Sequence, residues 1–334
     1  HFPSLFQEKM TAKMDALQVV GRGKAEFVRT SFPELVAGHA IVQPKYVTLC
    51  GSDVWMLSHA PEAAYPFPPG TTGHEVIAEI VELGDGLEGH DVGDFVLAIA
   101  PDHRAMAERY LTPKENLLKL PAGKTREELL MAQQLGTVLY ACKQLPSVIG
   151  KTVAVVGQGT AGLWFNFVVQ RLGASKVIAL DPKPNRLLLA HQYGASDTIN
   201  IREEDPIEKV FAINDGKLAD IVVEAAGRET SINLAIELTR EDTGFFLQFG
   251  VPYEPTSVNY GRIFTKCLKH KSIVHAGREP GHTSTLQALD LIAGDYVNVS
   301  PLLTHRFPFE RVLEAYEVHQ NATDNAVKIV IDMP

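Results

Sequence analysis

Residues 152–162 constrain the fold most, because a short β-branched run there leads directly into the glycine pattern Gly157-x-Gly159-x-x-Gly162. In a strand–turn–helix unit each glycine has its own task. The first permits a tight turn, the second lets the backbone approach a pyrophosphate, and the third lets the helix pack on the strand. The helix N-terminus then offers unpaired N–H groups to the phosphates. A glycine-rich structural turn would carry the same letters, but the strand before it and the helical segment after it favour dinucleotide binding.

An acidic residue, Asp181, ends the next apolar run at 176–181. A carboxylate at this point of a dinucleotide-binding unit accepts hydrogen bonds from the ribose 2′-hydroxyl and repels a 2′-phosphate. We therefore predict NAD rather than NADP as the cofactor. Arg186 either lies beside the adenine or simply starts a helix, and Thr160 and Ala161 complete the predicted phosphate-binding turn.

The bulk composition excludes several classes of protein. A chain of 334 residues is long for a single core, so two domains are expected. A net charge of -9 argues against nucleic acid or an anionic membrane as the main partner. No apolar run approaches the roughly 20 residues of a membrane span, and residues 1–13 lack the pattern of a signal peptide. Three widely spaced cysteines form no disulfide framework, which favours the reducing cytoplasm.

The rhythm of the sequence changes twice. Residues 1–140 contain short stretches of alternating apolar and polar residues, which predict a β-rich, partly closed barrel. Residues 141–275 alternate strands with helices, which predicts a doubly wound parallel sheet, the Rossmann type of α/β fold. Residues 276–334 are expected to complete the first domain. The predicted strands are 38–48, 75–83, 91–99, 152–157, 176–181, 197–201, 219–225, 243–249, 272–275 and 326–331, and the predicted helices include 186–193 and 283–293.

Two clusters in the first domain carry groups that could bind a metal, namely the Cys-Gly-Ser-Asp run at 50–53 and the Gly-His-Glu run at 73–75. Thiolate, imidazole and carboxylate are ligands that zinc selects. Taken alone, however, one cysteine and one histidine two dozen residues apart are better explained as a small buried thiol and a hydrogen-bonded imidazole.

The order of these motifs along the chain changes that interpretation. The chain resembles the zinc-type medium-chain dehydrogenase/reductase family, especially its polyol and secondary-alcohol branches. The resemblance covers roughly residues 35–331. It rests on the runs at 50–53 and 73–75, the glycine turn at 157–162, Phe-Gly-Val-Pro at 249–252, Leu-Leu-Thr-His at 302–305 and Val-Lys-Ile-Val at 327–330. It implies that the first domain is GroES-like and that the protein forms a homo-oligomer, either a dimer or a tetramer.

The resemblance also implies roles for residues of the metal site. Cys50 and His74 match two ligands of a catalytic zinc, and Glu75 lies behind the metal or joins its shell. Asp53 matches the carboxylate that orients the ligand histidine. Ser52 matches the hydroxyl that hands on the substrate proton.

Further residues match the cofactor site of the family. Thr137 and the backbone of Phe249, Gly250 and Val251 correspond to positions that line the nicotinamide. Ala226 is also predicted to touch the cofactor. Lys328 is predicted to contact the cofactor phosphates.

Three departures from the family pattern affect the metal site. The usual third zinc ligand is replaced by Gln133, whose neutral amide is a poorer ligand. Glu75 could bind instead, Gln133 could bind weakly, or the site could be empty. The relay histidine is replaced by Trp55, for which His59 or His103 could substitute. The structural-zinc lobe is missing, and three cysteines could not supply its four ligands, so only one zinc is expected.

The sequence thus predicts an NAD-dependent, zinc-dependent dehydrogenase that oxidises a secondary alcohol or polyol to the carbonyl, or catalyses the reverse. Its partner would be a small-molecule substrate whose identity stays open. Two alternatives also remain open. One is a zinc-independent enone or quinone reductase of the same fold, and the other is a non-catalytic dinucleotide-binding protein.

Overall fold

The computed structural model describes residues 12–273 and 279–334. The chain divides into two compact units, one formed by His1–Gln133 with Gly281–Pro334 and the other by Gln134–Pro280. The boundary predicted at 275/276 lies outside the described residues. Each unit has its own sheet and its own hydrophobic core.

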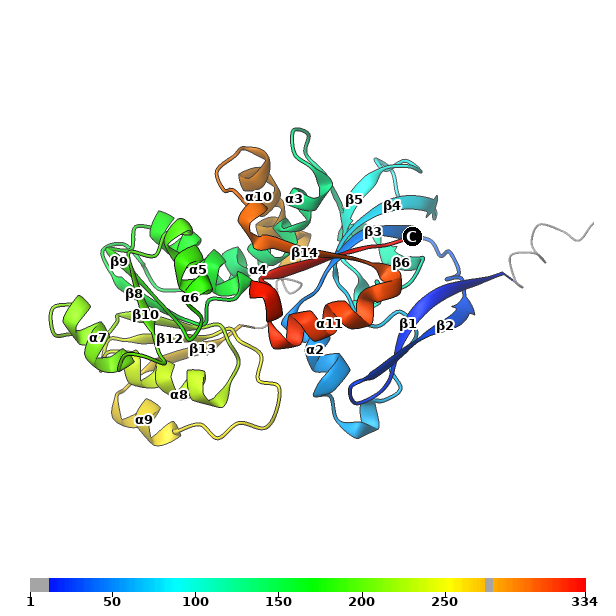
Figure 1. Cartoon of the computed structure of the whole chain (residues 1–334). Coiled ribbons are helices and arrows are strands. Elements are labelled where there is room, and N and C mark those ends of the chain that lie inside the picture. The colour runs from blue at the N-terminus through cyan, green and yellow to red at the C-terminus, as the bar shows by residue number, and fades with distance from the viewer. Residues whose placement is uncertain (1–11, 274–278) are drawn as a thin grey trace, which may run out of the picture. The chain divides into compact units, whose positions relative to one another are not determined.

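The second unit is built on a six-stranded parallel sheet in the order β10-β9-β8-β11-β12-β13. Helices α5 and α6 cover one face and α8 and α9 the other (Figure 1). The direction of winding reverses between β8 and β11, and ligands of doubly wound sheets bind at such a switch point. The strands are β8 (Thr152–Val156), β9 (Lys176–Asp181), β10 (Asp197–Asn200), β11 (Ile221–Glu224), β12 (Phe245–Gln248) and β13 (Lys269–Ser272). The helices are α4 (Ala132–Cys142, which begins in the first unit), α5 (Thr160–Arg171), α6 (Pro184–Gln192), α7 (Pro206–Ile213), α8 (Glu229–Leu238) and α9 (Tyr260–Thr265).

The predicted doubly wound fold is confirmed, but one strand was placed wrongly. The strand predicted at 272–275 is β13, at Lys269–Ser272, and the end of the predicted segment lies outside the described residues. All four residues of β13 are exposed at the edge of the sheet, so it carries no apolar pattern. By contrast, all five residues of β8 are buried, as expected for a central parallel strand.

The first unit contains a mixed seven-stranded sheet in the order β14-β15-β3-β4-β5-β7, with β6 paired to β3. Its core gathers apolar side chains from strands far apart in sequence, including Val47, Ile80 and Ile331. The strands are β3 (His39–Thr48), β4 (Glu75–Leu83), β5 (Phe95–Ala98), β6 (Tyr110–Pro113), β7 (Leu117–Lys119), β14 (Leu303–Pro308) and β15 (Lys328–Asp332). The helices are α2 (Gly51–Ser58), α3 (Arg126–Leu130), α10 (Thr283–Ala293) and α11 (Val312–Asn321). The predicted β-rich first domain is confirmed, and β15 completes it from the C-terminal segment.

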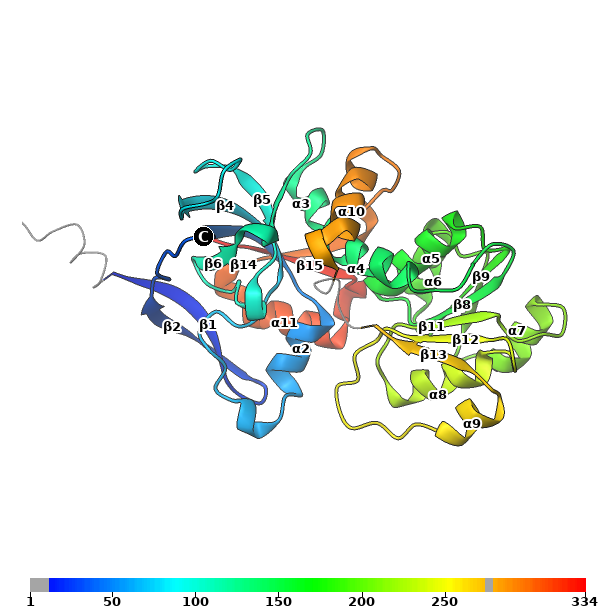
Figure 2. The same ribbon diagram turned by 180° about the vertical axis from the view of Figure 1, so that it is seen from behind.

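A hairpin that the sequence did not predict precedes this sheet. Strands β1 (Lys13–Gly21) and β2 (Lys24–Ser31) pair antiparallel and form a ribbon of their own (Figure 2). The backbone N–H of Leu17 donates to the carbonyl of Met106 at 2.8 Å, which ties the hairpin to the loop that follows β5.

In the part of the chain that the structure describes, no helix combines the length and the apolar character that a membrane crossing requires. The three cysteines, Cys50, Cys142 and Cys267, are unpaired.

Candidate cofactor and metal sites

The glycine turn lies between β8 and α5, and its three glycines differ in what the fold demands of them. Gly157 has a φ of +94°, and a Cβ placed there would approach the Cβ of Ala226 to 2.8 Å. A Cβ on Gly162 would lie 1.9 Å from the carbonyl oxygen of Gly157. A Cβ on Gly159, however, would meet nothing within 4 Å among the described residues. The fold itself therefore requires the first and third glycines, whereas the second leaves open space in front of the turn.

Asp181 ends β9 and fixes the shape of this turn. It is 3% exposed, and its two carboxylate oxygens accept hydrogen bonds from the backbone N–H groups of Gln158, at 2.7 Å, and Lys183, at 2.8 Å. Each oxygen keeps a second lone pair. The carboxylate is thus held in place by the protein and can still accept a hydroxyl hydrogen.

Several cations lie around Lys183, two residues after Asp181, and the sequence analysis predicted only Arg186 among them. Burial lowers the pKa of Lys183, and the charges of Arg186, Arg202 and Arg228 lower it further, while Asp181 opposes them. Lys183 and Arg186 lie at the start of α6, Arg202 lies after β10 and Arg228 is the N-cap of α8, so the cations come from three segments of one unit. They create a positive field suited to the phosphates of a dinucleotide.

Glu224 organises the other side of the cofactor unit, and the sequence analysis missed it. It ends β11, and its Oε1 accepts hydrogen bonds from the N–H groups of Ala226 and Gly227, both at 2.8 Å, and from the Ser231 hydroxyl at 2.7 Å. Its backbone carbonyl accepts the N–H of Gly250 at 3.0 Å. Burial raises the pKa of this carboxyl group, although these donors oppose the rise. Through its side chain and its backbone carbonyl, this one buried residue holds together two loops that carry predicted cofactor residues.

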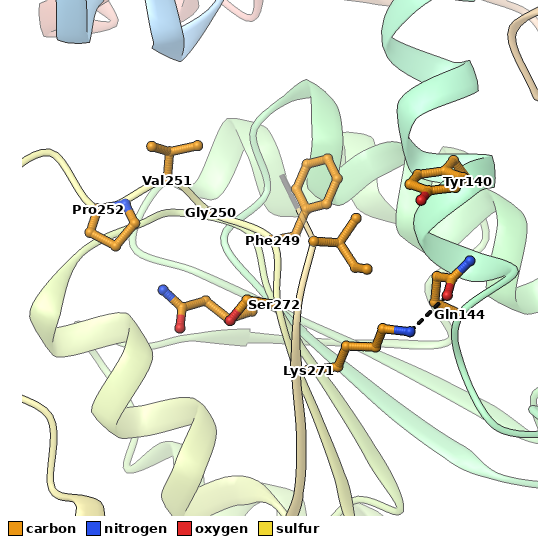
Figure 3. A pocket seen from close by; sticks show the side chains of 10 residues that line it. Tyr140, Gln144, Phe249, Gly250, Val251, Pro252, Lys271 and Ser272 are labelled. Atoms are coloured by element: carbon orange, nitrogen blue, oxygen red, sulfur yellow. Dashed lines mark hydrogen bonds between the residues drawn. The ribbon is translucent and has the colours of Figure 1, made fainter. Parts of the chain in front are cut away.

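The segment Phe249–Val251 lines a pocket of ≈ 470 Å³ within the second unit (Figure 3). Tyr140 on α4 and Gln144, which follows that helix, also line the pocket, and Lys271 donates to Gln144 Oε1 at 2.7 Å. Thr137 is a half-buried residue of the same helix, and its contact with the nicotinamide stays a prediction.

In the first unit, Asp53 joins the two predicted metal-binding clusters. Cys50 is the N-cap of α2, and its N–H donates to Asp53 Oδ2 at 2.8 Å. The N–H of Gly73 donates to Asp53 Oδ1 at 2.9 Å. This fully buried carboxylate therefore binds the backbone of both clusters and sets Cys50 near His74.

Two imidazoles face the same Asp53 oxygen. Nδ1 of His74 lies 3.9 Å and Nδ1 of His103 lies 3.8 Å from Oδ1. Burial opposes ionisation of Asp53, but the two histidines outweigh it and hold the pKa of the carboxyl group well below its usual range. Burial likewise opposes protonation of His74, yet the neighbouring carboxylate raises the pKa of its imidazole.

Glu75, the first residue of β4, is buried in an ion pair. Its Oε2 accepts from Lys328 Nζ at 2.5 Å and from the hydroxyl of Thr48. Both charged side chains are 1% exposed. The ammonium group of Lys328 is thus paired inside the first unit, and its predicted contact with the cofactor phosphates stays a prediction.

The donor atoms of Cys50, His74 and Glu75 all lie within 4.8 Å of one another. His74 Nδ1 and Glu75 Oε1 are buried without a hydrogen-bond partner among the described residues. Burial raises the pKa of the Cys50 thiol to about 11, and the Glu75 carboxylate adds to the rise. A cation would reverse this effect, because it stabilises the thiolate. A thiol, an imidazole and a carboxyl oxygen at this spacing fit a zinc ion.

The remaining predicted residues of the metal site lie on α2, at its C-terminal end and on α4. Ser52 is in the first turn of α2, and its hydroxyl is buried without a partner among the described residues. Trp55 follows on α2, which ends at His59. Gln133 is a half-buried residue of α4, and its role as a ligand stays a prediction.

Two family models match the chain. Residues 36–122 match the alcohol dehydrogenase GroES-like domain, and residues 162–293 match the zinc-binding dehydrogenase model. The first match covers both predicted metal-binding clusters, at 50–53 and 73–75. The second begins at the last glycine of the turn.

Relatives align with almost the whole chain. An L-threonine 3-dehydrogenase of Bacillus licheniformis is 27% identical over 350 residues, which covers 96% of this chain and 100% of the relative. A sorbitol dehydrogenase of Bos taurus is 27% identical over 348 residues, which covers 95% and 96%. Among solved structures, the alcohol dehydrogenase TADH from Thermus sp. ATN1 superposes with a TM-score of 0.79 at 25% identity, covering 96% of this chain and 100% of that one.

Proposed function

Since the chain belongs to the zinc-type medium-chain dehydrogenase/reductase family, we propose that it is an NAD-dependent, zinc-dependent dehydrogenase. It would oxidise a secondary alcohol or polyol to the carbonyl, or catalyse the reverse. The observation that carries the proposal is the cluster of Cys50, His74 and Glu75, whose donor atoms lie within 4.8 Å of one another. The names of the relatives, which include sorbitol, threonine and alcohol dehydrogenases, support the substrate class.

Cys50 and His74 would hold the metal, with Glu75 or Gln133 as the third ligand. A zinc ion bound there supplies Lewis acidity, which makes a substrate hydroxyl easier to deprotonate. Ser52, whose buried hydroxyl lacks a partner among the described residues, would accept and pass on that proton. Asp53 would keep His74 oriented.

NAD is proposed as the hydride acceptor because Asp181 presents a fixed carboxylate where the ribose would lie. The surrounding cations Lys183, Arg186, Arg202 and Arg228 would attract the diphosphate. Initial rates with NAD and NADP at equal concentration test this part. A clear preference for NADP would contradict it.

The decisive experiment combines metal analysis with a substrate screen. Protein purified without chelator is expected to contain stoichiometric zinc and to reduce NAD with at least one member of a panel of polyols, sugar acids and secondary alcohols. Stripping the metal should abolish the activity, and added zinc should restore it. Substoichiometric zinc together with activity that resists a strong chelator would overturn the proposal.

One observation favours a second candidate, a zinc-independent enone or quinone reductase. Lys328 already neutralises Glu75, and the site is charge-compensated by the protein alone. Reduction of enones or quinones by fully metal-free protein at undiminished rate would favour this candidate.

We also propose that the protein is a homo-oligomer. Strand β13 is an exposed sheet edge, and Tyr260 and Phe264 nearby in sequence are 72% and 77% exposed. Such features suit an interface with a second copy. Sedimentation equilibrium would reveal a monomer if this proposal is wrong.

A further inference from the structure

We propose that His103 is a ligand of the same metal ion as Cys50 and His74. The inference rests on the proposed function in so far as it assumes that these two residues bind zinc. Nothing in the family matches reported above assigns a role to His103, which lies in the short segment after β5.

The first argument is the geometry of the two histidines. Their ring centroids are 4.2 Å apart, and the rings are inclined at 51°. The donor atoms of Asp53, His74 and His103 lie within 4.8 Å of one another, so His74 belongs to two candidate metal clusters at once. Both Nδ1 atoms face one oxygen of Asp53, which leaves the Nε2 atom of each ring for another partner.

Carboxylates that face Nδ1 of metal-binding histidines fix the tautomer and the orientation of the ring. Asp53 stands in that relation to both rings, at 3.9 Å from His74 and 3.8 Å from His103. Nδ1 of His103 is buried without a hydrogen-bond partner among the described residues, as is Nδ1 of His74. The two imidazoles therefore stand in the same relation to Asp53.

The backbone holds His103 at this place against its own preference. Asp102 and His103 have φ values of +51° and +54°, a region that costs an L-residue about 1–2 kcal/mol. The N–H of Ala105 is shared by the carbonyls of Thr72 and Gly73, at 3.2 Å each. The loop is thus bonded directly to the segment that carries His74, and backbone strain of this kind is concentrated at functional sites.

The chemistry of the alternatives also favours His103. Gln133 offers only a neutral amide, and one oxygen of Glu75 is occupied by Lys328 and Thr48. A catalytic zinc uses three protein ligands and keeps a fourth position open, and one thiolate with two imidazoles makes such a set. With His103 as the third ligand, Glu75 can remain paired with Lys328.

The test compares zinc affinity rather than turnover. Stripped wild-type protein, His103→Asn and a matched control, His39→Asn, would be titrated with zinc against a chromophoric chelator. His39 is a half-buried histidine of β3 whose Nδ1 contacts only the carbonyl of Ala37 among its described partners. His103→Asn should lose at least about a hundredfold in zinc affinity, the upper range for residues that merely orient ligands, and the control should stay within twofold of wild type.

Cobalt substitution provides the second readout. The visible ligand-field spectrum of the Co²⁺ protein should change in His103→Asn and stay unchanged in His39→Asn. Unchanged zinc affinity and an unchanged cobalt spectrum in His103→Asn would overturn the proposal, even if the variant were inactive. If wild-type protein bound no zinc at all, both the proposed function and the ligation by His103 would be refuted. If wild-type protein binds zinc and His103→Asn binds it equally tightly, only the ligation by His103 is refuted and the proposed function stands.

A measurement on wild-type protein covers the case in which His103→Asn does not fold. The His103 side chain is 31% exposed and should react with diethyl pyrocarbonate in metal-free protein. Bound zinc should protect it, as measured by peptide mass spectrometry. Equal modification with and without zinc would contradict ligation by His103.

Discussion

Two buried aspartates, one in each unit, have similar local structures and different surroundings. Asp53 and Asp181 each accept two backbone N–H groups and thereby tie two segments together. The hydrogen bonds described for Asp181 come from backbone donors, whereas Asp53 also faces the rings of His74 and His103. The comparison indicates that backbone hydrogen bonds to a buried aspartate shape both sites, whereas only the proposed metal site also leaves buried side-chain atoms, His74 Nδ1 and Glu75 Oε1, without a partner among the described residues.

Removal of the thiol should have the largest effect. In Cys50→Ala, kcat/KM should fall at least about a thousandfold, because a catalytic metal contributes several kcal/mol of transition-state stabilisation. Zinc content measured by plasma spectrometry should fall in parallel, while the affinity for NAD should not change. Cys267→Ser, which alters an exposed thiol, serves as the control. Full activity in Cys50→Ala would remove the metal from the mechanism.

Substitution of Asp53 tests whether this carboxylate orients the imidazoles. Asp53→Asn should weaken zinc binding about 10–100-fold, as found for groups that position metal ligands. The amide can replace one acceptor but offers N–H to a site that already receives N–H donors. Chelator competition gives the zinc affinity, and circular dichroism checks the fold. A variant that folds and binds zinc as tightly as wild type would refute the contrast with Asp181.

Substitution of Asp181 should affect the cofactor alone. Asp181→Ala should relax the preference for NAD over NADP by about tenfold or more, because a hydrogen bond to a charged group contributes about 1.5–3 kcal/mol. The cations around Lys183 would then face a 2′-phosphate without a competing carboxylate. Kinetic constants with both cofactors measure this, and zinc content should match wild type. An unchanged cofactor preference would mean that Asp181 serves only the turn.

Two glycines of the turn are required for different reasons: Gly159 leaves room for the cofactor, whereas Gly162 leaves room for the protein backbone. Gly159→Ala should leave the unfolding midpoint unchanged but weaken NAD binding about tenfold, or ~1.4 kcal/mol, since its Cβ would enter the open space before the turn. Gly162→Ala should instead destabilise the protein by about 1–3 kcal/mol, because its Cβ would overlap the Gly157 carbonyl. Thermal melts and NAD titrations separate the two effects. Equal loss of stability in both variants would contradict this distinction.

Much of the cofactor unit could be predicted from the sequence because its signals are local. The buried β8 and the glycine turn lie within a dozen residues, and each glycine has a reason that the sequence context reveals. Glu224 escaped notice because a strand-terminal acid looks the same whether it is solvated or organises two loops. Strand β13 was misplaced because an exposed edge strand needs no apolar alternation.

The metal cluster depends on contacts that no local pattern encodes. Cys50 and His74 could be identified through the family resemblance. The approach of His103 to His74 could not, because it arises from two positive φ values and from backbone hydrogen bonds between segments some thirty residues apart. The family resemblance assigns Lys328 to the cofactor phosphates. Its ion pair with Glu75 could not be predicted, because the two residues lie on strands distant in sequence that only the folded sheet brings together.

A third aspartate provides the baseline for the comparison, and its substitution should have the smallest effect. Asp220 accepts the N–H of Thr152 at 3.0 Å and pairs with Arg240. Burial opposes ionisation, but these donors lower its pKa. A lowered folded-state pKa means that the unfolded state binds the proton more readily. The resulting stability is present above the unfolded-state pKa and is lost as the pH falls through the folded-state pKa.

Asp220→Asn should therefore lose about 1 kcal/mol of stability at neutral pH, and the difference from wild type should shrink on acidification. Urea unfolding at a series of pH values measures this. Zinc affinity and NAD affinity should both equal those of wild type, because the residue contacts neither cluster. Should Asp220→Asn weaken zinc or NAD binding as much as Asp53→Asn or Asp181→Ala does, loss of any buried carboxylate would be enough to disturb the sites, and the specific roles of Asp53 and Asp181 would not stand.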